Sequence, residues 1–301
     1  MAAYPDHPIR LVVPFGPGGG TDLLARVVAE QMSRALGQPV VVENKAGAGG
    51  TIGTDFVAKS KPDGYTLLMG TNATLALAPG LYKQLPYDPL KDLTPVTSIA
   101  TGPSILTVNP TVPVSDVRSL VAYLKSKPGE LNYGSAGNGS MAHIATSLMD
   151  QLAGTRSTHV PFRGGAAATQ ELVAGRLQFM IAGPVETVPL VEAGKVRALA
   201  VTTPARFPGL PALPTMAEAG IPGYEITNWF GIFAPAGTPQ DIVDRLASSV
   251  APFLADPAAG AAFVKQGVQP APMSGAEYRA FVQRDVAKWT REVRALNIAT
   301  E

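Results

Sequence analysis

Two segments of this chain share one plan, in which an apolar strand runs into a glycine-rich turn and then into an amphipathic helix. The segments span residues 9–35 and 131–152, so they lie in different halves of the chain. In open α/β sheets, turns of this kind lie at the carboxyl ends of parallel strands. The plan therefore predicts an α/β fold, and its repetition predicts two lobes that each carry one such turn.

Both turns contain hydroxyl residues where their helices begin. The first turn follows the strand Ile9–Val13 and contains Thr21, and the second turn covers Gly134–Ser140. Thr21 and Ser140 are predicted to cap the two helices, because a hydroxyl oxygen can accept a hydrogen bond from the first helical N–H groups. The apolar stripe predicted for the second helix comprises Met141, Ile144, Ala145, Leu148, Met149 and Leu152.

Short β-branched runs alternate with helical periodicity along the rest of the chain. Further strands are expected at residues 39–43, 65–69, 105–108, 158–162, 177–181, 197–201 and 225–234. Further helices are expected at residues 54–60, 117–125 and 166–174, after an N-cap at Thr238, and after a capping box at 274–277. We place the lobe boundaries near Ala100 and Gly223, which gives a discontinuous first lobe (1–100 and 224–301) and a second lobe (101–223). Two crossover strands then link the lobes, an arrangement suited to hinge motion.

Composition excludes several classes of protein. The 301 residues carry a formal net charge of +1 and no run of Lys or Arg, so nucleic acid is not expected as a partner. There are no cysteines, which removes disulfides, thiolate nucleophiles and sulfur metal ligands. No apolar run approaches the roughly 20 residues that cross a bilayer. The first five residues lack the profile of a secretory signal, which leaves a cytoplasmic chain and a mature exported chain both open.

Known catalytic and nucleotide motifs are not found in the turns. The first turn has no Lys after its glycines, and Gly47–Gly53 misses the G-x-G-x-x-G spacing by one residue. Neither Ser135 nor Ser140 lies in a G-x-S-x-G motif, and the histidines show no metal-ligand spacing or carboxylate partner. The sequence therefore predicts no catalytic residue, metal or cofactor.

The glycine-rich turns suit an anionic ligand. Glycine lets the backbone approach a ligand closely, and the first helical N–H groups carry about half a positive charge. The alternative is that the turns are only tight connections. Asp22 can contact a ligand or simply complement the helix dipole, and His143 can reach the ligand or lie buried. Arg163 can grip a second carboxylate with its two-pronged guanidinium group, or it can be an ordinary surface arginine.

Five motifs in order resemble the extracytoplasmic solute receptors of tripartite tricarboxylate transporters, the Bug family. The resemblance runs from about Tyr4 to the C-terminal helix. The motifs are Pro14-Phe15-Gly16-Pro17-Gly18-Gly19-Gly20-Thr21-Asp22, Val42-Glu43-Asn44-Lys45-Ala46-Gly47-Ala48-Gly49-Gly50, Lys61-Pro62-Asp63-Gly64-Tyr65-Thr66-Leu67-Leu68, Tyr133-Gly134-Ser135-Ala136-Gly137 and Val160-Pro161-Phe162-Arg163-Gly164-Gly165.

This resemblance implies a two-lobed type II periplasmic-binding-protein fold (Venus flytrap) with mostly parallel sheets and two crossover strands. It also implies export to the periplasm, a small carboxylate held between the lobes, and delivery to the membrane permease of the transporter. We expect a monomer. The implied ligand-binding residues are Phe15, Gly19, Gly20, Thr21, Asp22, Thr71, Asn72, Ala73, Ser135, Ala136, Gly139, Ser140, His143 and Arg163.

Ala182 departs from the family pattern, because many relatives carry an acidic residue at this place after the strand at 177–181. Without that charge a ligand with an ammonium group is not expected, and a dicarboxylate or an aromatic carboxylate is favoured. Two other functions stay open from the residues. One is an enzyme acting on a small carboxylate or phosphate in the same cleft, and the other is a regulatory domain that senses a metabolite.

Overall fold

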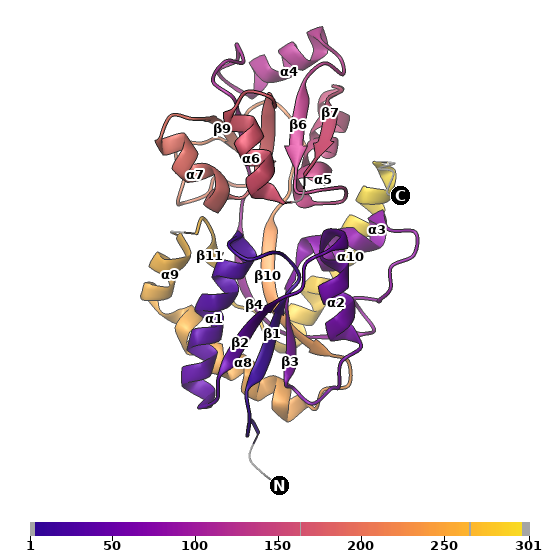
Figure 1. Cartoon of the computed structure of the whole chain (residues 1–301), viewed down its shortest axis with the longest axis vertical. Coiled ribbons are helices and arrows are strands. Elements are labelled where there is room, and N and C mark those ends of the chain that lie inside the picture. Colours follow the sequence, from indigo (N-terminus) through magenta and orange to yellow (C-terminus); the bar gives the residue numbers. More distant parts are fainter. Residues whose placement is uncertain (1–3, 163, 265, 297–301) are drawn as a thin grey trace. The chain divides into compact units, whose positions relative to one another are not determined.

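The chain folds into two compact units, each built around its own sheet (Figure 1). The computed structural model describes residues 4–162, 164–264 and 266–296. The first unit runs up to Thr101 and resumes over Trp229–Ala295, and the second unit comprises Gly102–Asn228. The chain passes from one unit to the other along β4 (Leu93–Gly102) and returns along β10 (Asn228–Pro235). The expected α/β fold class is confirmed, but both sheets are mixed and not mostly parallel, since each contains antiparallel pairs.

The first unit has a six-stranded mixed sheet in the order β11-β4-β10-β3-β1-β2. Strand β1 is parallel to both β2 and β3, while β10 lies antiparallel to β3. The strands other than β4 and β10 are β1 (Ile9–Val13), β2 (Val40–Asn44), β3 (Thr66–Thr71) and β11 (Gln269–Pro270). The helical segments are α1 (Gly20–Leu36), the 3-10 turn η1 (Ala48–Gly50), α2 (Thr51–Ala58), the π-helical turn η2 (Ala73–Leu77), α3 (Ala78–Leu81), α8 (Gln240–Ala255), α9 (Pro257–Val264) and α10 (Gly275–Ala295).

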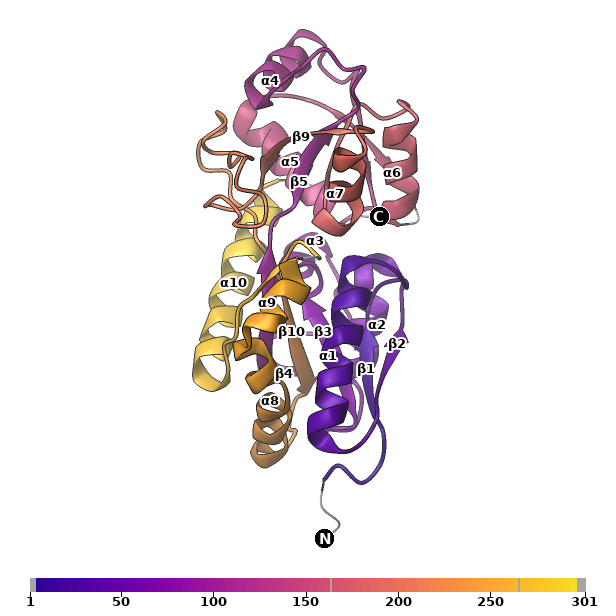
Figure 2. The ribbon, with the colours of Figure 1, turned by 90° about the vertical axis from the view of Figure 1, so that its left-hand side faces the viewer.

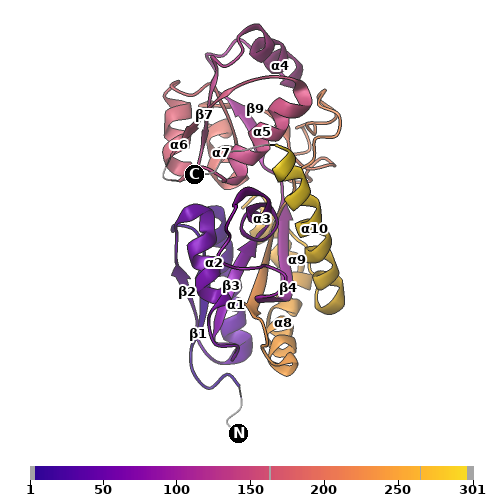
Figure 3. The same ribbon diagram turned by 90° about the vertical axis from the view of Figure 1, so that its right-hand side faces the viewer.

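Both faces of this sheet are apolar because helices cover both of them. On β10, Ile232 and Ala234 join the core beneath α1 and α8. Trp229 and Phe233 alternate with them and meet the aromatic side chains of α10 on the opposite face. Figure 2 shows α1 with α8 and α9, and Figure 3 shows α2, α3 and α10 from the other side. A strand buried on both faces is apolar at consecutive positions, as at Leu11, Val12 and Val13 of β1.

The second unit has a five-stranded mixed sheet in the order β7-β6-β8-β5-β9. Strand β6 is parallel to β7 and β8, and β5 is antiparallel to β8 and β9. Its strands are β5 (Ile105–Val108), β6 (Asn132–Ser135), β7 (Thr158–Pro161), β8 (Phe179–Ala182) and β9 (Arg197–Val201). Its helices are α4 (Val117–Ser126), α5 (Met141–Ala153), α6 (Gly165–Val173) and α7 (Pro184–Glu192).

Two predicted caps and one predicted core residue are wrong. Helix α1 begins at Gly20, two residues earlier than a cap at Thr21 predicts, with Gly19 at its N-cap, so Thr21 lies within the first turn and does not cap. Helix α8 has Pro239 at its N-cap, and Thr238 instead donates to the Pro235 carbonyl at 2.8 Å. Leu152, one residue before the end of α5, is 41% exposed.

None of the helices in the described part of the chain combines the length and the apolar character needed to cross a membrane.

Candidate functional site

Three strand-end loops of the first unit meet around Gly50. A Cβ atom built on Gly50 would lie 2.6 Å from Cγ2 of Thr74 and 3.2 Å from the ring of Phe15. Gly50 also has a φ of +94°, a conformation that residues with a side chain rarely adopt. The loops that follow β1, β2 and β3 therefore approach so closely that only glycine fits between them. This convergence brings Phe15 to the loop that contains Thr71, Asn72 and Ala73.

The carboxylate of Asp22 holds the first glycine turn in shape. Asp22 is only 2% exposed, and its two oxygens accept from the backbone N–H of Gly18 and from the guanidinium of Arg26, each at 3.0 Å. Asn44 at the end of β2 donates to Asp22 Oδ1 at 2.9 Å and to the Phe15 carbonyl at 3.0 Å. This bonding supports a structural role for the Asp22 side chain, which goes beyond the two roles considered, ligand contact and complementing the helix dipole.

The start of α1 keeps its positive character despite this acidic residue. Burial opposes ionisation of Asp22, but the bonds from Arg26, Gly18 and Asn44 outweigh it, and the pKa of Asp22 lies below its usual value. Since Arg26 balances the charge of Asp22, the N–H groups of Gly20 and Thr21 keep the partial positive charge of a helix N-terminus.

The loop after β3 is fixed by its own side chains. Thr71 Oγ1 accepts from the Thr74 N–H at 3.4 Å, and Asn72 Oδ1 accepts from the Ala73 N–H at 3.1 Å. Thr71 and Asn72 are 4% and 2% exposed. Most of their polar atoms thus shape the loop, and Ala73 begins the π-helical turn η2 that follows.

In the second unit, Ser135 and Ser140 hold opposite ends of the second glycine turn and differ in their hydrogen bonding. Ser135 is fully buried, and its hydroxyl accepts from the Gly137 N–H at 3.1 Å and contacts Nε2 of His159 at 2.6 Å. Ser140 occupies the N-cap of α5, as expected, but its hydroxyl makes no capping bond. Its Oγ is buried and has no hydrogen-bond partner among the described residues. Ser140 therefore offers an unused hydroxyl at the start of a helix, whereas Ser135 is used internally.

His143 and His159 form a stacked pair that sequence reasoning missed. Their rings lie 3.9 Å apart at 14°, and Tyr133 stacks on His159 at 5.0 Å. Nδ1 of His143 accepts from the Gly139 N–H at 3.1 Å, so His143 is the buried histidine of the two alternatives considered. No local sequence pattern predicts this pair, because the pairing depends on β7 lying beside β6 in register, with His159 opposite Tyr133. The third histidine, His7, contradicts the expectation of no carboxylate partner, since it pairs with Asp6 at 2.6 Å on the surface.

Burial keeps the two imidazoles neutral near pH 7. It lowers the pKa of His143, and together with the neighbouring His143 it lowers the pKa of His159 to about 4.

A carboxyl group lies near the predicted site where the sequence suggested none. Ala182 is 5% exposed at the end of β8 and packs into the apolar cluster beneath α6. Glu186 lies in the first turn of α7, and a Cβ built on Gly165 would lie 2.4 Å from its Oε1. Burial raises the pKa of Glu186. The second unit therefore places an acidic group against the start of α6, only four residues beyond Ala182.

Arg163, the predicted second anion ligand, lies outside the described residues. Ala136 is exposed beside the turn, and Gly139 is buried with a φ of +74°. In the described ranges, no group of three or more His, Asp or Glu side chains is arranged to hold a metal ion.

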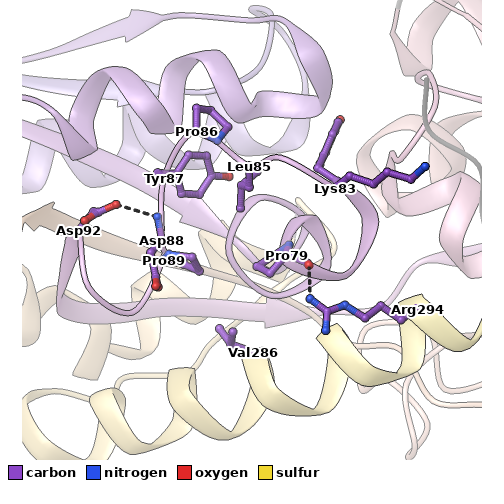
Figure 4. A pocket seen from close by; sticks show the side chains of 11 residues that line it. Pro79, Lys83, Leu85, Pro86, Tyr87, Asp88, Pro89, Asp92, Val286 and Arg294 are labelled. Carbon is purple, nitrogen blue, oxygen red and sulfur yellow. Dashed lines mark hydrogen bonds between the residues drawn. The ribbon is translucent and has the colours of Figure 1, made fainter.

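A surface hollow of about 510 Å³ lies within the first unit (Figure 4). It separates the segment at 79–92 from α10, and Arg294 reaches across to the Pro79 carbonyl at 3.5 Å. None of the predicted ligand-binding residues lines it.

Comparison with known proteins gives one matching family model, described as the tripartite tricarboxylate transporter family receptor, over residues 24–298. Among curated proteins, the chain is 38% identical to the protein BugT of Bordetella pertussis, over 97% of this chain and 90% of BugT.

Three solved structures are similar over nearly the whole chain. An R. palustris protein with adipate has a TM-score of 0.93 and 40% identity, covering 98% of this chain and 99% of that one. The periplasmic binding protein BugD has a TM-score of 0.90 and 34% identity, with 99% and 100% covered. MatC from Rhodopseudomonas palustris with bound malate has a TM-score of 0.87 and 34% identity, with 96% and 100% covered. These likenesses confirm the periplasmic-binding-protein fold that the motifs imply.

Proposed function

Because the chain belongs to the tripartite tricarboxylate transporter family of receptors, we propose that it captures a small organic carboxylate and delivers it to the family's membrane permease. The proposal includes location in the periplasm and a monomeric receptor. The observation that carries it is the start of α1. There Arg26 neutralises the Asp22 carboxylate, while the N–H groups of the first helical residues stay available. Such a terminus binds carboxylate oxygens without a cofactor.

The second unit contributes complementary groups. Ser140 supplies a hydroxyl with no partner among the described residues, at the start of a second helix. The similar R. palustris proteins with adipate and with malate support a dicarboxylate as ligand. An aromatic carboxylate is the second ligand class that we propose. Glu186 lies against Gly165 at the start of α6, close in the chain to the predicted ligand residue Arg163, so amino acids belong in any binding test.

No reaction is part of this proposal. Among the described residues, the contact between a serine hydroxyl and an imidazole nitrogen is that of Ser135 with His159, which joins a fully buried hydroxyl to a half-buried ring. A nucleophile must reach the substrate with its base alongside. The Ser135 hydroxyl instead bonds its own turn at both the N–H and the carbonyl of Gly137, so we assign it a structural role.

A thermal-shift panel tests the function. It compares dicarboxylates such as adipate and malate with benzoate-type acids, amino acids and neutral sugars at pH 7.5. A ligand that binds only the folded protein stabilises it, by about 2.7 kcal/mol when the ligand concentration is 100 times Kd. This stabilisation raises the melting temperature. We expect the largest rise from a dicarboxylate or an aromatic acid. A response confined to sugars or to zwitterionic amino acids would contradict the proposal.

The family fold also predicts closure on binding, since two units that each offer an anion-binding turn can enclose the ligand only by moving together. Small-angle scattering should then show a smaller radius of gyration with saturating ligand. An unchanged radius would count against closure.

A further inference from the structure

The second glycine turn is held by imidazole side chains at two points. Ser135, at its beginning, contacts Nε2 of His159 at 2.6 Å. Gly139, near its end, donates its N–H to Nδ1 of His143 at 3.1 Å. The two rings stack at 3.9 Å, so α5 and β7 support the turn as one unit.

The hydrogen bond at Gly139 fixes the protonation state of His143. A backbone N–H can only donate, so the Nδ1 atom that receives it must carry no proton. Neutral His143 then carries its proton on Nε2. Adding a second proton places an N–H on Nδ1 directly against the N–H of Gly139, and this contact cannot be a hydrogen bond.

The surroundings of the pair oppose a positive charge. The titratable groups that face it in the described part of the chain are Tyr133 on β6, whose pKa burial raises, and Asp150 on α5 beside Tyr133. Asp150 is already engaged by Thr155 and Ser157. In the described ranges no carboxylate pairs with either imidazole. Each charged ring would also repel the other across 3.9 Å.

From this geometry we propose that His143 and His159 are positioning residues that hold the turn 135–140 in its ligand-binding shape only while neutral, so that acid releases the turn and the ligand. The inference rests on the proposed function as far as the ligand is concerned. The two histidines are not placed in contact with the ligand. They act through the backbone of Gly139 and through Ser135.

The direction of the pH effect follows from linkage. Burial lowers the pKa values of both rings below 6.5, so the unfolded or opened turn binds more protons than the ordered turn. The free energy that favours the ordered turn therefore has its full value above pH 6.5, and it decreases as the pH falls from 6.5 towards about 4. One linked proton weakens binding at most about tenfold per pH unit. Ordinary carboxyl groups titrate near pH 4, so the ligand itself stays ionised at pH 5.5.

Calorimetric titration with adipate at pH 7.5, 6.5 and 5.5 tests the proposal. We expect the wild-type Kd to rise about tenfold between pH 7.5 and 5.5. His143→Asn keeps an acceptor oxygen near the Nδ1 position but cannot take up a proton, so only His159 is left to titrate and the rise in Kd should be clearly smaller than in the wild type. His7→Asn, at an exposed histidine in the first unit, is the matched control and should follow the wild type. A flat wild-type profile, or a His143→Asn profile identical to the wild type, would overturn the proposal.

A second readout needs no ligand. Hydrogen exchange of the backbone amides at 134–141, corrected for the intrinsic effect of pH, should show about tenfold lower protection at pH 5.5 than at 7.5 in the wild type. The same amides in His143→Asn should lose clearly less of their protection, because only His159 is left to titrate. If adipate fails to bind but exchange follows this pattern, the choice of ligand is wrong and the inference stands. If protection does not change with pH, the inference is wrong whatever adipate does.

Discussion

Removing the Asp22 carboxylate should destabilise the first unit far more than removing a similar carboxylate from the same helix. Asp22 accepts bonds from Gly18, Arg26 and Asn44 while 2% exposed. Deleting one member of a buried ion pair costs about 3 to 5 kcal/mol. We expect the lower end, about 3 kcal/mol for Asp22→Ala, because the Arg26 side chain is 52% exposed and can be hydrated.

Glu30 supplies the matched control. Glu30 pairs with Arg34 four residues later on α1, which is the same spacing as that of Asp22 and Arg26. Both side chains are exposed, Glu30 at 59% and Arg34 at 68%. Exposed pairs contribute about 0.2 to 1 kcal/mol. Urea denaturation followed by tryptophan fluorescence is a suitable assay, because both tryptophans of the chain, Trp229 and Trp289, lie in the first unit.

The pH dependence adds a second check on Asp22. Its pKa is lowered in the folded protein, so its stabilisation is present above the unfolded value of about 3.9 and is lost as the pH falls through the folded value. The difference between wild type and Asp22→Ala should therefore be full at pH 7 and shrink at pH 3. Equal losses for Asp22→Ala and Glu30→Ala at pH 7 would refute the structural role assigned to this carboxylate.

Three further substitutions test other parts of the site. Glu186→Gln should raise the melting temperature at pH 8, because burial disfavours the ionised wild-type carboxylate. In calorimetric scans at pH 5 this difference should be smaller, because protonation of Glu186 removes the cost of burying its charge. Ser140→Ala should change the unfolding free energy by less than about 0.5 kcal/mol, since the hydroxyl does not cap, yet it should weaken ligand binding by about 1.5 to 3 kcal/mol. The control is Asp116→Ala, which removes the cap of α4. It should cost about 0.5 to 2 kcal/mol of stability and leave binding unchanged. Gly19→Ala places a methyl group where nothing lies within 4 Å, so stability should fall by less than about 1 kcal/mol while the affinity for the ligand falls more than tenfold. Its control is Gly260→Ala in α9, which has equally open surroundings and should leave binding unchanged.

The strands and main helices could be predicted because their signals are local. Strands β5 and β9 have the expected bounds, 105–108 and 197–201, since compact β-branched or apolar runs end at turn residues. Helix α7 was missed because Pro189 lies inside it and Pro184 opens it. A proline inside a short segment predicts a break, and only packing against the sheet overrides that signal.

The glycine turns could also be located from sequence, but not the groups that hold them. Asp22 meets Asn44 across 22 residues, and Ser135 meets His159 across 24. Both contacts depend on which strands become neighbours, information that periodicity does not contain. For the same reason the sequence predicted the loss of an acidic group at Ala182, whereas the structure places the carboxyl group of Glu186, from the first turn of α7, against the start of α6.

Calorimetric titration of the tightest-binding dicarboxylate, side by side with its uncharged diamide at pH 7.5, tests the central claim most directly. The two compounds have nearly the same shape and differ in charge, so the comparison isolates anion recognition by the helix termini and turn amides. Each charge-assisted bond is worth about 1.5 to 3 kcal/mol, and 1.4 kcal/mol is tenfold in Kd. We predict that the diamide binds at least about 100-fold more weakly. A diamide that binds within threefold of the acid, or a protein that binds no carboxylate of the panel, would contradict the account.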